Sequence, residues 1–180
     1  MSNTHRKQKN GRVVNLPVYV SNHITDDMIA LFIQSGEALS VNAGIISEQV
    51  VLPYLEQYFE SPGERVDADG YDHLFDNGIR NEHKKLSIRK TSAAAKNIGE
   101  NKQGRCDTFS FHHPGTNSIY VIDAETFYSG AILNYDKTGN CFDVNFYNDM
   151  QLEGKGKRIG CNAWKNTELL LTKASQIKLV

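Results

Sequence analysis

Apolar and polar positions follow two different periods along this chain, and together they predict a mixed α/β fold. Between residues 40 and 59 the apolar side chains recur at helical spacing, which predicts a long helix with a kink or break at Pro53. A short helix is expected from Thr25, which suits an N-cap, to about Gln34. Strands are expected over residues 13–20, 86–88, 108–111, 118–122, 131–135 and 141–146.

The remaining pattern sets the expected domain organisation. Residues 89–106 are polar, rich in Lys, Ala, Asn and Gly, and are expected to form a helix or a loop. The sequence shows no internal repeat and no linker to a second domain. The expected fold is α/β: a central mixed sheet with an antiparallel hairpin, flanked by helices on its N-terminal side. Residues 13–180 are expected to form a single domain after a flexible arm, residues 1–12, which is either disordered or in contact with DNA.

A β-hairpin is predicted around Asn77. Residues 76–78, Asp-Asn-Gly, favour a tight turn because Asn and Gly tolerate the positive φ angles that such turns need. With the turn centred on Asn77, Asp72 and Glu82 lie five residues to either side and face each other across the two strands. Lys84 follows Glu82 by two residues and therefore shares its face of the strand.

Two opposed carboxylates and an ammonium at one place indicate a particular chemistry. Directly opposed side chains lie ~5 Å apart, and like charges that close are unfavourable unless a cation lies between them. The pair therefore suits a divalent metal ion with a polarised water beside it. The alternative is a surface hairpin whose acids and lysines form ordinary ion pairs.

The spacing Asp-x9-Glu-x-Lys on a hairpin resembles the catalytic core of the PD-(D/E)xK nucleases, Type II restriction endonucleases among them. The resemblance implies a restriction-endonuclease-like fold in which Asp72 and Glu82 hold Mg²⁺. It implies that Lys84 positions or activates the attacking water. It also implies that Glu48, on the preceding long helix, supplies a further acid to the metal.

Histidines near this motif extend the resemblance. His112 and His113 match a downstream element that contacts DNA in the family; otherwise they belong to a structural loop, and two histidines without further ligands are weak evidence for zinc. His83, between the Glu and Lys of the motif, stands where a core strand usually carries an aliphatic side chain. Because Asn81 and Lys85 share its face, we expect that face to be partly open or to meet DNA.

Charge is distributed unevenly along the chain. The whole sequence has 20 basic and 21 acidic residues, a net charge of −1, so no overall basic excess indicates nucleic acid. From residue 84 to residue 105, however, Glu100 is the only acid. This local excess predicts contacts with a phosphate backbone, with a solvated loop as the alternative. The residues of this stretch expected to bind DNA are Lys85, Arg89, Lys90, Lys96 and Arg105.

Other features limit the expected setting. No apolar run approaches the ~18 residues that a membrane span needs. Residues 1–11 are followed by no apolar segment of the kind found in secretory signals. The three cysteines show no CxxC spacing and are expected to be free thiols in the cytoplasm.

Together these features predict a small Mg²⁺-dependent endonuclease that hydrolyses phosphodiester bonds of double-stranded DNA, either a sequence-specific Type II restriction enzyme or a phage nuclease. A homodimer is expected if the DNA site is palindromic, with residues 25–34 as a candidate interface. Two other classes stay open. One is a non-catalytic nucleic-acid-binding module that uses residues 85–105, and the other is a protein-interaction domain of a phage or mobile element.

Overall fold

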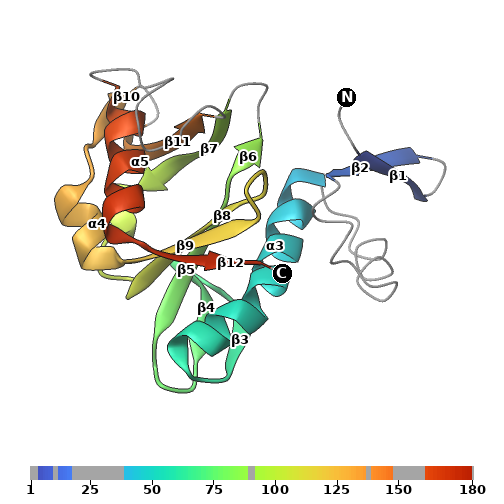
Figure 1. Ribbon diagram of the computed structural model, residues 1–180, viewed down its shortest axis with the longest axis horizontal. Coiled ribbons are helices and arrows are strands. Elements are labelled where there is room, and N and C mark those ends of the chain that lie inside the picture. Colours follow the sequence, from blue (N-terminus) through green and yellow to red (C-terminus); the bar gives the residue numbers. More distant parts are fainter. Residues whose placement is uncertain are drawn as a thin grey trace.

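The computed structural model describes residues 4–9, 12–17, 39–88, 92–136, 139–147 and 161–179 of the chain (Figure 1). The helices in these ranges are α3 (Leu39–Phe59), α4 (Ala124–Gly130) and α5 (Asn162–Lys173), with a 3-10 turn, η1 (Glu100–Lys102). The first strands are β1 (Thr4–Lys9), β2 (Arg12–Pro17), β3 (Gly63–Ala68), β4 (Tyr71–Phe75), β5 (Arg80–Lys85) and β6 (Ser87–Ile88). The later strands are β7 (Ser92–Gly99), β8 (Thr108–His113), β9 (Ser118–Asp123), β10 (Asn134–Asp136), β11 (Gly139–Tyr147) and β12 (Ser175–Lys178).

A six-stranded mixed sheet, in the order β12-β9-β8-β5-β4-β3, forms the centre of this α/β fold. Neighbouring strands pair antiparallel except β5 and β8, which are parallel. A parallel pair needs a long crossover connection, and here the crossover contains β6, β7 and η1. It returns the chain to the start of β5, where the N–H of Asp107 donates to the main-chain oxygen of Arg80 at 2.8 Å.

The β4–β5 hairpin has the turn that the sequence predicts. Gly78 adopts a φ of 87°, a conformation that favours glycine, and its N–H donates to the main-chain oxygen of Phe75 at 2.8 Å. A second tight turn, through Asp69 and Gly70, joins β3 to β4, and Gly70 has a φ of 103°. This turn is not among the predicted ones, although Asp-Gly is a strong hairpin signal.

Helix α3 covers one face of the six-stranded sheet (Figure 1). Ser47, Val51 and Leu55 repeat every four residues and are all buried, so one side of the helix faces the strands. Val51 and Leu55 pack into a cluster with strand residues Phe75, Ile119 and Val121. The helix continues through Pro53, so the break that this proline predicts is absent. Apolar burial on both sides of the proline offsets the hydrogen bond that it removes.

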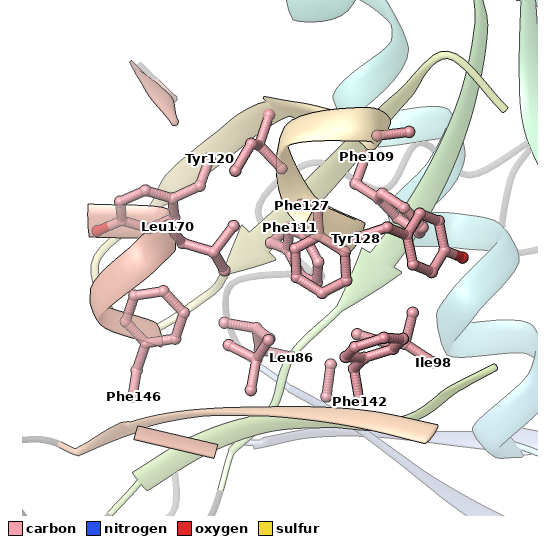
Figure 2. Close-up of a cluster of buried hydrophobic side chains, with 14 of the residues drawn as sticks. Leu86, Ile98, Phe109, Phe111, Tyr120, Phe127, Tyr128, Phe142, Phe146 and Leu170 are labelled. Carbon is pink, nitrogen blue, oxygen red and sulfur yellow. The ribbon is translucent and has the colours of Figure 1, made fainter. Parts of the chain in front are cut away.

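The opposite face of the sheet packs against α4, α5 and a second, four-stranded sheet in the order β10-β11-β7-β6. An aromatic cluster fills the space between these layers (Figure 2). The rings of Phe109 and Phe111 on β8 lie with their centroids 5.1 and 5.7 Å from that of Phe127 on α4. Such packing fixes β8 and, through the β5–β8 pairing, the strand that carries Glu82 and Lys84.

Two further predictions about secondary structure need correction. In the stretch expected to be a helix or loop, residues 92–99 form strand β7, paired with β11 and β6. Alanine favours helices in isolation, but Ala93, Ala94 and Ala95 are buried here, so packing between the two sheets overrides local propensity. Helices also flank the sheet from the C-terminal half of the chain, as α4 and α5, and not from the N-terminal side alone.

Near the N-terminus, β1 and β2 pair as a separate two-stranded antiparallel sheet. Strand β1 falls within the stretch expected to be a flexible arm, and the role of that arm stays a prediction. The short helix expected over residues 25–34, with its part in a dimer, lies outside the described residues. All three cysteines are free thiols, as predicted. None of the described helices is both long and apolar enough to cross a lipid bilayer.

Candidate active site

Asp72 and Glu82 lie on neighbouring antiparallel strands, β4 and β5. The pairing places His73 opposite Asn81. Because Asp72 precedes the first of these residues and Glu82 follows the second, the register sets the two acids opposite each other. The main-chain N–H of His83 donates to Oδ2 of Asp72 at 2.7 Å, which holds one carboxylate oxygen against the neighbouring strand.

Glu82 is a buried carboxylate with two ammonium partners. Its side chain is 2% exposed and that of Lys84 is 26% exposed, and the Nζ of Lys84 binds Oε1 of Glu82. Lys102, from η1 in the crossover, binds the same oxygen at 3.2 Å and is 36% exposed. Partners of this kind offset the loss of hydration that a buried carboxylate suffers. The acid–lysine pair of β5 is thus joined by a lysine from a distant part of the chain.

Asp72 is an acid whose ionised form is disfavoured by its surroundings. Burial raises the pKa of Asp72 to about 6, and the negative charges of Glu82 and Glu48 contribute in the same direction. The charge of Lys84 and the hydrogen bond from His83 lower this pKa and offset part of the effect. A cation next to Asp72 would relieve the repulsion, so the environment of this acid favours a positive ion.

Glu48, the further acid implied by the resemblance, has an ion-pair partner of its own. Its carboxylate on α3 accepts a 2.6 Å hydrogen bond from Nε of Arg65 on β3. Among the described residues, no group of three or more His, Cys, Asp or Glu side chains is placed to hold a metal ion. Mg²⁺, however, often takes one or two carboxylates and completes its shell with water and phosphate oxygens. Asp72 and Glu82 fit that donor set, and Glu48 as a ligand stays a prediction.

Most of the polar face of β5 is buried beneath α3, so the expectation of an open face is wrong at Asn81 and His83. Asn81 is 0% and His83 4% exposed. Nδ2 of Asn81 donates to Nδ1 of His73 at 3.1 Å and to Oγ of Ser110 at 2.9 Å. Nδ1 of His83 lies 2.9 Å from the same Ser110 oxygen. A chain of side-chain hydrogen bonds therefore satisfies these groups in the interior, where no nucleic acid reaches them.

This buried network continues into α3 through Ser47. The hydroxyl of Ser47 lies 2.9 Å from Nε2 of His83 and 2.9 Å from Nδ1 of His112. At its other end, Nε2 of His73 donates to the main-chain oxygen of Glu48 at 2.9 Å. Burial lowers the pKa of His73, and it lowers that of His83 well below the ordinary value. The rings are therefore neutral at physiological pH, and the network ties α3 to the strands that carry the acids.

The two histidines expected to contact DNA are both buried. His112 is bound to Ser47 within the network. Nδ1 of His113 accepts from the N–H of Thr116 at 3.2 Å, and its ring packs edge-on against Phe146 with the centroids 5.2 Å apart. In this arrangement both rings serve the interior. Direct contact between this pair and base edges would require the fold to open, so it stays a prediction without support from the described contacts.

The basic residues expected to line DNA are spread over several elements. Lys96 is exposed on β7, and Arg105 is exposed between η1 and β8, where its guanidinium is in an ion pair. Lys85 is half-buried at the end of β5, and burial lowers its pKa. Arg89 and Lys90 lie outside the described residues. Among the predicted DNA-binding residues of this stretch that the structure describes, the exposed cations are Lys96 and Arg105.

Two residues central to the site, Lys102 and Ser47, are not among the site residues predicted from the sequence. Lys102 belongs to the basic stretch, but its contact with Glu82 depends on the path of the crossover, for which the sequence carries no local signal. Ser47 lies in the buried stripe of α3, four residues before Val51. A serine at a core position of an amphipathic helix was the available signal for a buried polar partner.

No protein-family model matches this chain, and no curated protein matches it in sequence. The geometry of the site is therefore the basis for assigning a function. Two opposed carboxylates, one held by lysines and the other short of positive charge, can hold a divalent cation beside a bound phosphate.

Proposed function

We propose that this protein is a Mg²⁺-dependent endonuclease that hydrolyses phosphodiester bonds of double-stranded DNA at specific sequences, as a Type II restriction enzyme does. One observation supports the proposal most. Asp72 and Glu82 oppose each other across β4 and β5, and Lys84 on the same strand binds Glu82. This arrangement resembles the catalytic core of the PD-(D/E)xK nucleases. A restriction-endonuclease-like fold is part of the proposal, with the hairpin in a mixed sheet beside the parallel strand β8.

In the proposed site Asp72 and Glu82 hold the Mg²⁺. When bound, the ion offsets charge on the phosphate and makes a neighbouring water more acidic. The hydrogen bond from the N–H of His83 orients the Asp72 carboxylate. Lys84, partly exposed beside Glu82, stabilises the negative charge that develops on the phosphate oxygens. Burial of Glu82 keeps its oxygens away from bulk water, which strengthens their attraction for a cation.

Double-stranded DNA and a second copy of the chain are the partners in this proposal. A two-fold symmetric protein matches a palindromic DNA site, and each subunit would then cut one strand. The exposed cations Lys96 and Arg105 supply contacts to phosphates, which give affinity without sequence preference. The reducing cytoplasm is the proposed location, in keeping with the free thiols.

Incubation of the purified protein with mixed plasmid and phage DNA and Mg²⁺ tests the proposal. The wild-type protein is expected to give discrete bands, and Asp72→Asn and Glu82→Gln are expected to abolish them, because each replaces an anionic ligand with a neutral amide. Glu64→Gln is the matched control, since Glu64 is an exposed carboxylate on β3 of the same sheet. Thermal unfolding of each variant separates loss of the site from loss of the fold.

The same experiment distinguishes the other two classes. DNA binding by the wild-type protein without cleavage in Mg²⁺, Mn²⁺ or Co²⁺ would show a non-catalytic binding module. Neither binding nor cleavage would direct attention to a protein-interaction domain. Cleavage that persists in Asp72→Asn would exclude this pair of acids as the metal site.

A further inference from the structure

Oε1 of Glu82 is shared by two lysines that reach it from different elements. Lys84 comes from the same strand, and Lys102 comes from η1, in the crossover between β5 and β8. Lys84 alone already gives this carboxylate a positive partner. Lys102 adds a second positive charge at the same oxygen, and this residue is not part of the acid–acid–lysine motif.

The two lysines are attached to the site in different ways. Lys84 is two residues from Glu82 on a paired strand, so the backbone keeps its ammonium close. Lys102 is the last residue of a 3-10 turn that contains no buried residue, and its side chain is 36% exposed. Its ammonium is held by the contact with Glu82 and is attached to the backbone through a flexible four-carbon side chain. Of the two lysines, Lys102 can change partner with less rearrangement.

A divalent cation at Asp72 and Glu82 would compete with these ammonium groups for carboxylate oxygens. Positive charges a few ångströms apart repel each other strongly in a partly buried site. The strand keeps Lys84 near the acids, whereas Lys102 can move away from Oε1. A phosphate of a bound nucleic acid is the anion that the proposed function brings to this place, and it attracts the displaced ammonium.

We propose that Lys102 is a second catalytic lysine. It neutralises Glu82 before the metal binds, and afterwards it contacts a non-bridging oxygen of the phosphate that is cleaved. The inference rests on the proposed function and specifies how charge is exchanged within that same site. The ammonium keeps its protons throughout and exchanges one oxygen partner for another. The structure thus assigns a role to a residue that lies outside the hairpin motif.

Lys102→Met tests this role because it removes the charge and keeps an apolar stem of similar length. The matched control is Lys165→Met, at an exposed position of α5. Calorimetric titration with Mn²⁺ in the absence of DNA is expected to show several-fold tighter binding to Lys102→Met, since a competitor for Oε1 is gone. Single-turnover cleavage of plasmid DNA at saturating Mn²⁺ is expected to be slower by roughly 10²-fold. Lys102→Arg is expected to restore part of the rate.

Metal affinity and cleavage rate therefore move in opposite directions, which a purely structural role would not produce. Wild-type values of both in Lys102→Met would overturn the inference and leave the nuclease proposal standing. Weaker metal binding, slower cleavage and a lower unfolding temperature together would also overturn it, because they would assign Lys102 to the fold. If the wild-type protein neither binds metal nor cleaves, the inference and the proposed function both fail.

Discussion

The main-chain N–H of His83 donates to Oδ2 of Asp72 at 2.7 Å, so the central residue of the Glu-x-Lys motif also orients the other acid of the site. The ring of the same residue is bound on the opposite side of the sheet by Ser47 and Ser110. A single residue thus connects the buried network under α3 with the proposed metal site. Removal of the Ser47 hydroxyl therefore measures how much that network contributes to stability.

Ser47→Ala is expected to lower the free energy of unfolding by about 1–3 kcal/mol. The hydroxyl serves Nε2 of His83 and Nδ1 of His112, and its removal takes this partner from two buried rings. Denaturant unfolding measures the effect. Ser129→Ala is the control, because the Ser129 hydroxyl is exposed and bonds the main-chain oxygen of Thr126 within its own helix. Equal stability of the two variants would show that the buried network contributes nothing.

Asp72→Asn is expected to make the metal-free protein more stable than the wild type near pH 8. The pKa of Asp72 is raised from 3.8 to about 6, so the folded protein holds this proton more tightly than the unfolded chain. Wild-type stability therefore falls as the pH rises through that window, and the deficit is fully present above it. The shift corresponds to roughly 3 kcal/mol as an upper value, reduced by the solvent that reaches this side chain.

Unfolding free energies of both proteins at about pH 4 and pH 8 measure this difference. An asparagine oxygen can still accept the hydrogen bond from the N–H of His83, so the comparison isolates the charge. Added Mg²⁺ is expected to stabilise the wild type and leave Asp72→Asn unchanged, because only the carboxylate binds it well. A wild type at least as stable as the variant near pH 8 would contradict the electrostatic account of Asp72.

The buried histidines predict a pH dependence of the opposite sign. Burial lowers the pKa of His73, His83 and His113 below 6.5, so the unfolded chain binds protons that these rings do not bind in the fold. Their contribution to stability is complete above pH 6.5 and is lost as the pH falls below it. In Asp72→Asn the opposing contribution of the Asp72 carboxyl is absent. The free energy of unfolding of this variant is therefore expected to fall more steeply than that of the wild type as the pH is lowered from about 7 to 5. A flat profile in that variant would contradict the neutral, buried state of the rings.

The hairpin could be predicted from the sequence because its determinants are local. The Asp-Asn-Gly turn fixes the register, and the two-residue side-chain period of a strand then places Asp72, Glu82 and Lys84. The long helix and the strands β8 and β9 follow equally from local periodicity. These are the parts in which neighbours in sequence are also neighbours in the structure.

The parts of the fold and of the site that the sequence did not predict depend on contacts between segments far apart in the chain. The alanines of β7 become a strand because two sheets pack there, and Lys102 meets Glu82 because the crossover returns to β5. The polar residues on one face of β5 predict exposure, but in the fold α3 covers this face and places Ser47 against His83. Isolated sequence patterns carry no information on such pairings, since each depends on which face another element covers.

Lys84→Ala is expected to slow cleavage by several orders of magnitude while metal binding is largely retained. The ammonium acts on the charge of the phosphate and is not a metal ligand.

Ca²⁺ is expected to support specific DNA binding without cleavage in the wild type, since it accepts longer distances and looser geometry than Mg²⁺. Gel shifts in Ca²⁺ and single-turnover cleavage in Mg²⁺ measure both effects. DNA affinity that is independent of divalent ions would contradict a metal bridge between protein and phosphate.

Salt dependence separates phosphate contacts from a solvated charge bias. Lys96→Ala and Arg105→Ala are each expected to weaken DNA binding. Each is also expected to reduce the magnitude of the slope of log K against log salt by roughly 0.9, because a protein with one phosphate contact fewer releases fewer counterions on binding. The guanidinium of Arg105 is held by Asp69 in the free protein, so Asp69→Asn is expected to strengthen binding by removing that competitor. Lys165→Ala on α5 is the control.

The weaker binding and the smaller salt slope of Lys96→Ala and Arg105→Ala are expected to be alike on cognate and random duplexes. Phosphate contacts position a protein on DNA, whereas base contacts specify the site. His112→Ala or His113→Ala provides the contrast. A neutral ring that reads a base edge changes specificity without changing the salt slope, but both rings are buried here, so their replacement is expected to lower stability instead. Wild-type slopes in both Lys96→Ala and Arg105→Ala would show that neither cation touches the DNA backbone and that the local basic excess is only a solvated surface.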